Sequence, residues 1–481
     1  MLRNLILPDR WWSLVVVAFT GKLLLLLLVL WEHHAPLTGD FYAFWGHSTG
    51  YTEPVESLLS GAGYPQASRM PGYAVPYLFL RLIMNVHGAL RSLVVLQVLA
   101  SALGVVLLAK LAYAFTHDLR AFRWTYWLAL LAVFTSFYDR YILTESFSSS
   151  ALILATWAIV RHGKHAGRWV LFLAGTATAW LIFMKPVFLP VLLVVAAFMV
   201  VQDKFQWRRI LPKMMLFFTP FLLADGVWSL RNAVSFGVFQ PLTDGVFSSA
   251  LREGVKYPVI RLVQAYGGNI LWWDPSAEIL WFNVREADQP AEQPLDGPFP
   301  FPEHVLTEDC PMDTLERVAF LVNAYNSTDG VARKRALAAV SAACDRCVTS
   351  FRRDRPFHYH ITARLRMLRL FVLTPGNSAL MAKPFAELNA LEKALKLLYA
   401  LICVGTIIPG IIWGLRSFFH ARSSVDLRLV SALMLYGVFI FPLAMRMTET
   451  RYLTTVYPFA VLFTVLMGIK AWDSTHQRSS A

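Results

Sequence analysis

The sequence predicts an all-α polytopic membrane protein, and three observations support this fold class. Hydrophobic residues make up 56 % of the 481 residues, whereas charged residues make up only 16 %. Several apolar stretches reach the roughly 17 to 25 residues that a helix needs to cross a bilayer. None of them shows the two-residue alternation of a membrane β-barrel strand. The spans are therefore expected to be helices.

Ten apolar runs bounded by polar or charged residues are candidate spans. They cover residues 11–31, 91–116, 124–139, 146–160, 169–184, 187–202, 210–230, 394–415, 428–445 and 453–470. Basic residues precede the first run, and its core is too long for a signal peptide. It is therefore expected to be a retained signal anchor with the N-terminus inside.

The apolar stretch 71–88, "PGYAVPYLFLRLIMNVHG", is broken by Pro76 and Arg81. If it lies in the membrane interface, the inside segments hold about sixteen Lys and Arg and the short outside ones about seven, which satisfies the positive-inside rule. We therefore expect interfacial helices in the first outer loop, 32–90. The same bias accounts for most of the formal charge of +13, so no nucleic-acid partner is expected.

With this topology the chain has three parts. Residues 1–230 form a catalytic transmembrane module, 231–393 a mostly helical extracytoplasmic segment, and 394–481 the C-terminal transmembrane helices. Within the middle segment, "TDGVARKRALAAVSAACDRCVTSFRRD" predicts an amphipathic helix capped by Thr328 or Asp329.

Four cysteines are present. Cys403 lies in an apolar span and is expected to pack there. The outer location allows a disulfide, which we expect between Cys310 and either Cys344 or Cys347. The Cys344-x-x-Cys347 pair has no second pair, and no typical metal-ligand spacing appears elsewhere. No cofactor is therefore expected, and a divalent metal stays an open alternative.

Six charged residues are expected at the outer face: Asp40, Arg69, Glu145, Lys185, Arg231 and Arg451. Each has a structural explanation, since an Arg can reach up to lipid headgroups and a carboxylate can stabilise a helix N-terminus. Together they place two carboxylates and four cations on one side of the bilayer. This combination suits the handling of an anionic lipid headgroup.

Asp40 stands in "TGDFYAFWG", where aromatic residues follow the carboxylate directly. Aromatic side chains at the interface lower the local polarity, which suits a carboxylate to general-base work. Asp is also a favoured N-cap, so Asp40 can begin a helix at Phe41. The two roles are compatible.

An ordered set of short motifs resembles the C-type (GT-C) membrane glycosyltransferases, in particular the branch with protein O-mannosyltransferases and lipid A aminoarabinose transferases. The motifs are "GDFYAFW", "YPQASRMPGYAVPYLFL", "LTESFSSSALILA", "GTATAWLIFMKPVFLPVLL", "WSLRNAVSFGVFQPLTDGVFSSALREG" and "TETRYLTTVYPFAVL". The resemblance implies a GT-C-type helix bundle. It also implies an inverting transferase that moves a sugar, a hexose or a pentose, from a polyprenyl-phosphate carrier to a hydroxyl acceptor.

The resemblance assigns roles to three residues. Asp40 corresponds to the proposed base, Arg69 to the residue linked to the donor phosphate, and Glu145 to an acidic residue that supports the acceptor or the charge balance. Lys185, Arg231 and Arg451 are added as substrate-binding residues from their positions.

The expected partners are the lipid-linked donor, membrane lipids, and a glycan, lipid or protein as acceptor. The expected location is a bacterial inner membrane, with the active site facing the periplasm. A flippase or transporter for lipid-linked sugars and an O-antigen polymerase or ligase are the alternative functions.

Overall fold

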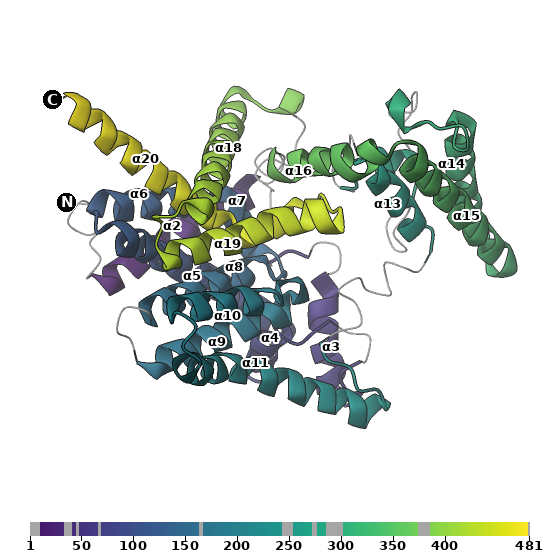
Figure 1. The fold of residues 1–481 in the computed structure, drawn as a ribbon. Coiled ribbons are helices and arrows are strands. Elements are labelled where there is room, and N and C mark those ends of the chain that lie inside the picture. Colours follow the sequence, from purple (N-terminus) through teal and green to yellow (C-terminus); the bar gives the residue numbers. More distant parts are fainter. Residues whose placement is uncertain are drawn as a thin grey trace. The chain divides into compact units, whose positions relative to one another are not determined.

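The structure, a computed structural model, describes nine stretches of the chain: residues 10–32, 41–44, 48–65, 69–162, 167–242, 254–271, 277–284, 302–373 and 385–479, with side chains up to residue 476 in the last of these. These residues form helices joined by loops (Figure 1). Two isolated bridges are the only β-type pairings among them. The chain divides into two compact units: residues 1–243, 375–437 and 451–481 form the first, and 244–374 with 438–450 form the second. The predicted boundaries at 230 and 393 stay a prediction.

The first unit holds most of the apolar helices. They are α2 (Trp11–Glu32), α3 (Thr49–Leu59), α4 (Ala74–Arg81), α5 (Val86–Thr116), α6 (Leu119–Leu130), α7 (Val133–Ser136), α8 (Glu145–His162), α9 (Arg168–Met184), α10 (Val191–Gln202), α11 (Trp207–Phe236), α18 (Ala390–Phe419), α19 (Val425–Phe439) and α20 (Tyr457–Ser479). Short 3₁₀ helices lie between them: η2 (Phe137–Arg140), η3 (Pro186–Phe188), η7 (Phe385–Glu387) and η9 (Thr450–Thr455).

Five helices are long and apolar enough to cross a membrane. They are α2, α5, α11, α18 and the run Val425–Met445, which joins α19 to the π-helical η8 (Ile440–Met445). Two further apolar helices, Arg168–Met184 and Pro186–Gln202, are shorter. The all-helical membrane class is confirmed by these helices, whereas the number of ten spans stays a prediction.

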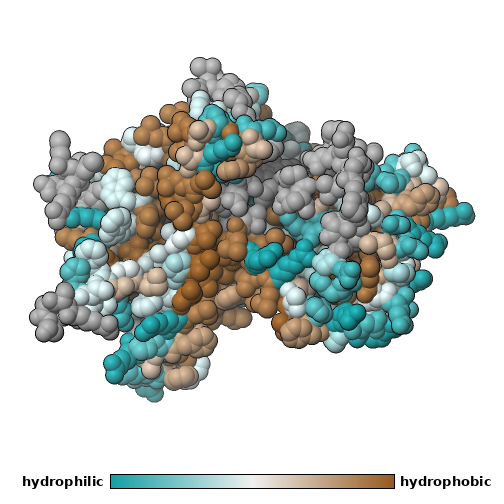
Figure 2. Space-filling view, turned by 90° about the horizontal axis from the view of Figure 1, so that it is seen from above, coloured by the Kyte–Doolittle hydropathy of each residue, from teal (hydrophilic) through white to brown (hydrophobic). Residues whose placement is uncertain are grey.

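The surface of the helices agrees with a lipid environment. Leu222, Leu223, Val227 and Leu230 of α11 are each more than 60 % exposed. Figure 2 shows hydrophobic side chains gathered over broad areas of one face of the molecule. Apolar exposure on this scale marks a surface that another apolar phase covers. The chain is thus an integral membrane protein.

The predicted span 124–139 is not one continuous helix. α6 ends at Leu130, and the chain continues through α7 and η2 to Arg140. Asp139 and Arg140 are both buried at this end. Buried charges need polar partners, and the irregular backbone lets Asp139 reach them, as described below.

The stretch 71–88 does not form one helix of membrane length, and its location in the membrane interface stays a prediction. α4 has eight residues and is about 12 Å long, which is too short for a hydrocarbon core of about 30 Å. Arg81 at its end clamps Glu56 of α3, with Nε 2.7 Å from Oε1 and Nη2 2.9 Å from Oε2. The hydrogen bonds from Arg81 hold the pKa of the Glu56 carboxyl below its usual value, and the pair joins α3 to α4.

Gln97, fully buried in α5, holds several loops around the bundle. Its Nε2 donates to the carbonyl oxygens of Asp139 (2.8 Å) and Tyr141 (2.9 Å). Its Oε1 accepts from the hydroxyl of Tyr73 at 2.7 Å. One amide thus satisfies the polar groups of two separate loops, which are otherwise costly to bury.

The second unit contains α13 (Lys256–Ala265), η4 (Glu278–Phe282), η5 (Glu303–Val305), α14 (Met312–Ser327), α15 (Gly330–Asp354), the π-helical η6 (His358–Thr362), α16 (Ala363–Leu373) and η8. Its core includes Val259, Phe282, Leu315, Val318 and Phe351. α15 matches the predicted amphipathic helix, and Asp329 rather than Thr328 occupies its N-cap position. The Asp329 side chain makes no capping hydrogen bond.

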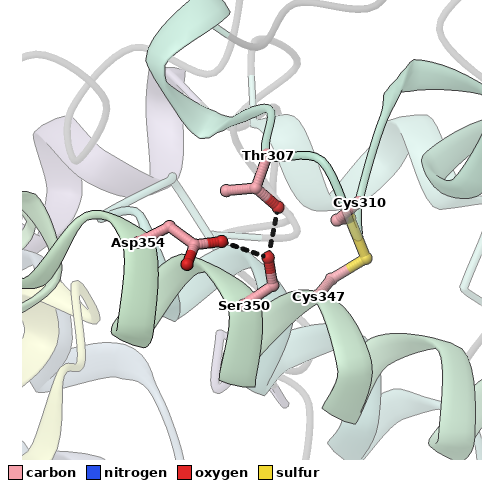
Figure 3. Close-up of a disulfide and its surroundings, with 5 residues drawn as sticks. All are labelled: Thr307, Cys310, Cys347, Ser350 and Asp354. Atoms are coloured by element: carbon pink, nitrogen blue, oxygen red, sulfur yellow. Dashed lines mark hydrogen bonds between the residues drawn. A yellow bond between two sulfur atoms is a disulfide. The ribbon is translucent and has the colours of Figure 1, made fainter.

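A disulfide fixes α15 to the loop before α14 (Figure 3). It joins Cys310 to Cys347, which resolves the two predicted pairings. Beside it, the Ser350 hydroxyl contacts that of Thr307 and donates to Asp354 at 2.9 Å. Cys344 is free and buried in the core, and burial raises the pKa of its thiol to about 12.

The Gln97→Ala substitution is expected to lower the stability of the first unit by at least about 2 kcal/mol. It leaves two carbonyls and the Tyr73 hydroxyl buried without this partner, and each such group costs about 1–3 kcal/mol. Thermal unfolding of the full chain in a mild detergent measures the effect. Gln206→Ala, at an exposed position before α11, is the control, and equal melting temperatures for the two variants would contradict the structural role of Gln97.

Thiol labelling tests the cysteine assignment. N-ethylmaleimide should not label Cys344 in the folded protein, because the thiol is buried and stays protonated at neutral pH. Denaturation without reductant should expose two thiols, Cys344 and Cys403, and reduction should expose all four cysteines. Mass spectrometry counts the labels, and peptide mapping that finds Cys347 labelled before reduction would overturn the pairing.

Candidate active site

Glu145, the first residue of α8, lies at the centre of a buried ionic cluster. The side chain is only 2 % exposed. The Nζ of Lys185 lies 3.2 Å from its Oε1, and the Nε of Arg451 lies 3.9 Å from the same oxygen. A buried carboxylate needs such counter-charges to stay ionised. The structure therefore brings together three of the six charged residues that the sequence singles out.

The backbone ends of three elements place these side chains. Lys185 follows α9 directly and precedes Pro186, which opens η3 and disfavours helical backbone at the residue before it. Arg451 belongs to η9, just before α20. The hydroxyl of Thr455 lies 3.3 Å from the Nζ of Lys185 and 3.2 Å from the hydroxyl of Ser148. Hydroxyl contacts thus supplement the ion pairs where α8, α9 and η9 meet.

Arg69 is held in place by two tyrosines of the segment between α2 and α5. Its Nη1 donates to the hydroxyl of Tyr51 at 2.6 Å, and its guanidinium carbon lies 4.4 Å from the centre of that ring. The hydroxyl of Tyr64 donates to the Arg69 carbonyl at 2.9 Å. The side chain and backbone of Arg69 are therefore both fixed.

Gly72 fixes the same loop against the end of α9. The indole Nε1 of Trp180 donates to its carbonyl at 2.8 Å. A Cβ at position 72 would lie 2.4 Å from the backbone carbon of Phe183, which no side chain tolerates. The glycine thus allows the loop with Arg69 to touch the chain two residues before Lys185.

A row of aromatic rings continues from Arg69 toward Glu145. The ring centres of Tyr51 and Tyr73 are 5.1 Å apart, and those of Tyr73 and Phe147 are 5.8 Å apart. Burial raises the pKa of the Tyr73 phenol, and the charges of Tyr51 and Glu145 add to this effect. Arg69 and the Glu145 cluster therefore belong to one neighbourhood.

Asp40 lies outside the described residues. The residues that follow it are described, and Ala43 forms a parallel bridge with Tyr141. The Ala43 amide donates to the Arg140 carbonyl at 3.0 Å, and the Ile142 amide donates back to Ala43 at 2.9 Å. The described residues 41–44 are thus paired with the segment that leads into Glu145.

Arg231 makes its described contacts elsewhere. It donates to the Asn232 side chain at 2.7 Å and to the carbonyl of Tyr64. Its guanidinium carbon lies 4.9 Å from the Trp228 ring and 4.7 Å from the Phe236 ring. This cage of aromatic rings indicates that Arg231 positions the loop around Tyr64 rather than joining the Glu145 cluster.

Sequence reasoning missed two buried charges, Lys22 and Asp139. Lys22 lies in the middle of α2, and its Nζ donates to the Ser136 hydroxyl at 2.7 Å. Asp139 accepts from the hydroxyl of Ser146 at 2.5 Å. A charge inside an apolar helix is a functional signal by default, so the "TGKLLLL" stretch could have drawn attention to Lys22.

Lys22, Asp139 and Glu145 line one cavity of about 30 Å³ in the first unit. Among the described residues, neither the Oδ2 of Asp139 nor the Oε2 of Glu145 has a hydrogen-bond partner. A polar cavity of this size has room for a water molecule, which could serve both oxygens. In the described part of the chain, no group of three or more His, Cys, Asp or Glu is placed to hold a metal ion.

The helices and the cluster define a helical membrane protein with a buried ionic site. No family model and no curated protein matches the chain. Among solved structures, the chain is similar to the crystal structure of ArnT from Cupriavidus metallidurans in the apo state, with 14 % sequence identity and a TM-score of 0.33. The similarity covers 94 % of this chain and 77 % of that chain.

A double-mutant cycle tests the coupling of Glu145 and Lys185. Each single change, Glu145→Gln or Lys185→Gln, leaves a buried charge with fewer partners and should cost about 3–5 kcal/mol. The double variant should be more stable than the sum of the two losses predicts. Unfolding of the detergent-solubilised full chain gives the three values, and simple additivity would show that the pair is not coupled.

Proposed function

We propose that this protein is a membrane glycosyltransferase that moves a sugar from a polyprenyl-phosphate carrier to a hydroxyl acceptor at the extracytoplasmic face. The observation that carries the proposal is the buried cluster of Glu145, Lys185 and Arg451. It lies in one neighbourhood with Arg69, and the resemblance of the motifs to the C-type glycosyltransferases supports the same function.

The reaction is an inverting displacement. The carboxylate of Asp40 takes the proton of the acceptor hydroxyl while that oxygen attacks the anomeric carbon of the sugar. The bond from this carbon to the phosphate oxygen breaks, and the polyprenyl phosphate leaves with the electron pair. Negative charge thus builds up on the leaving phosphate.

Cations near the leaving phosphate stabilise this charge. Arg69 supplies a guanidinium that its contacts with Tyr51 hold in place, and a fixed guanidinium forms paired hydrogen bonds to phosphate oxygens. Lys185 and Arg451 add positive charge, and Glu145 keeps both in position. Because their environment is buried, each interaction is stronger than it would be in water.

The same proposal places the protein in a bacterial inner membrane, with its active site facing the periplasm. It also includes the transfer of a sugar to a hydroxyl acceptor. A sugar-chain polymerase or ligase would use the loop arginine but would not need a carboxylate after the first span. A flippase is the alternative from another class, and one observation favours it: Lys22 is a buried charge in the middle of a membrane-length helix, as transporters often have.

Asp40→Asn tests the base. Transfer from a labelled polyprenyl-phosphate sugar should fall by about 10²- to 10⁴-fold, because the amide cannot accept the proton. Insertion and expression should not change. The measurement is donor consumption by the purified protein without a membrane gradient, which only a transferase supports.

The matched control is Glu53→Gln, which removes an exposed carboxylate from the same outer loop and should leave transfer intact. Full activity of the Asp40→Asn protein would reject Asp40 as the base. Absence of donor consumption by the unmodified protein, together with movement of the lipid-linked sugar across vesicles, would favour the flippase.

A further inference from the structure

The second unit contains two π-helical turns. η6 lies between α15 and α16, and η8 ends just before Arg446. α16 packs on η8, with the rings of Phe371 and Phe441 stacked 5.9 Å apart. π-helical turns are rare and often occur at functional sites, so two that both pack on α16 point to a specialised region.

Tyr359 of η6 contacts Arg446, the residue after η8, and Arg352 of α15. The guanidinium carbon of Arg446 lies 3.7 Å from the centre of the Tyr359 ring, and its Nη2 donates to the Tyr359 carbonyl at 3.0 Å. The guanidinium carbon of Arg352 lies 5.9 Å from the same ring centre. The backbone of Arg446 has a φ of 54°, a left-handed conformation that is unfavourable for this residue type.

Three arginines and a histidine gather here: Arg352, Arg364, Arg446 and His360. Burial lowers the pKa of Arg446, and the charges of Arg364 and Arg352 lower it further. Desolvation lowers the pKa of His360, and the charges of the three arginines lower it further, so this histidine is neutral at neutral pH. Arg352 and Arg364 are therefore close enough to Arg446 to repel it.

Carboxylates near the cluster have other partners. Asp354 pairs with Arg353, and Glu278 pairs with Arg366. None of the three arginines forms an ion pair with a described carboxylate. Within the same described residues, the buried Nε of Arg364 has no hydrogen-bond partner. Such a cluster is stabilised by an anion that accepts from several guanidinium groups.

The surroundings indicate a lipid as the source of that anion. Arg446 follows directly after Val425–Met445, one of the five membrane-length helices, so it lies at the level where headgroup phosphates occur. Phe357, Ile361 and Leu365, spaced four residues apart along the η6 and α16 segment, are 67 %, 46 % and 56 % exposed. Exposed apolar residues beside basic ones are typical of a segment that lies in a membrane interface.

We infer that Arg352, His360, Arg364 and Arg446, arranged around Tyr359, bind the phosphate group of a membrane lipid. The guanidinium groups donate paired hydrogen bonds to the phosphate oxygens, and the apolar side chains of the segment contact the acyl chains. The site lies within the second unit and does not depend on the proposed sugar transfer.

Lipid binding to the purified full chain in an uncharged detergent tests the inference. Short-chain phosphatidylglycerol is titrated while native mass spectrometry counts the bound molecules. Replacing Arg352 and Arg446 together by Gln should weaken binding by about a hundredfold, since each lost charge-assisted contact is worth about tenfold. Arg446→Lys, which keeps the charge, should retain most of the binding.

Arg335→Gln is the matched control, because Arg335 is exposed on the same helix α15 and lies about 25 Å from Arg352 along the helix axis. Its binding should equal that of the unmodified protein. The inference would be overturned if the double variant bound phosphatidylglycerol as tightly as the unmodified protein does. It would also be overturned if the unmodified protein bound diacylglycerol with the same acyl chains as tightly as phosphatidylglycerol.

Two further measurements complete the test. If inorganic phosphate bound the cluster as tightly as phosphatidylglycerol does, the conclusion that the anion comes from a lipid would be wrong. If the double variant does not fold, the unmodified protein still decides the question: raising the ionic strength should weaken lipid binding by screening, and a salt-independent affinity would contradict a charged site.

Discussion

Burying one carboxylate is the constraint on which the candidate site depends. Glu145 is almost fully enclosed, and its charge is tolerated only because Lys185 and Arg451 approach it from segments far away in the sequence. The start of α8, the end of α9 and the turn η9 must therefore meet. Close backbone contact at Gly72 and the amide of Gln97 hold the surrounding loops in compatible positions.

The helices could largely be predicted from the sequence because apolar runs of membrane length have few other ways to bury their backbone. The same reasoning excluded a spanning helix over residues 71–88, since proline and arginine interrupt this apolar run. It failed between residues 131 and 144, where buried polar contacts rather than hydropathy determine the backbone. Gln97 and Ser146 both form hydrogen bonds with Asp139. A periodic pattern of apolar residues does not predict such contacts.

A charged residue at the end of an apolar segment was a good sign that it belongs to the candidate site. Its position did not predict which other charged residues it contacts. Glu145, Lys185 and Arg451 meet, and Arg69 joins them through tyrosines. Arg231 also stands near the end of an apolar segment, yet it lies among aromatic rings. The rings near Tyr64 contact its guanidinium in place of the Glu145 carboxylate. Lys22 was missed because one charge hardly changes the hydropathy of a long apolar helix.

The free thiol of Cys344 has a consequence for how the second unit matures. Cys344 and Cys347 lie three residues apart, so their side chains leave α15 only about 60° from each other. Before the helix packs, Cys310 can reach either thiol. Bonding to Cys344 would rotate the helix and draw Val340 and Phe351, which belong to the core, out of place. Packing of the apolar face of α15 must therefore determine which cysteine bonds to Cys310. If the disulfide formed before the helix packed, the chain could be trapped in a misfolded state.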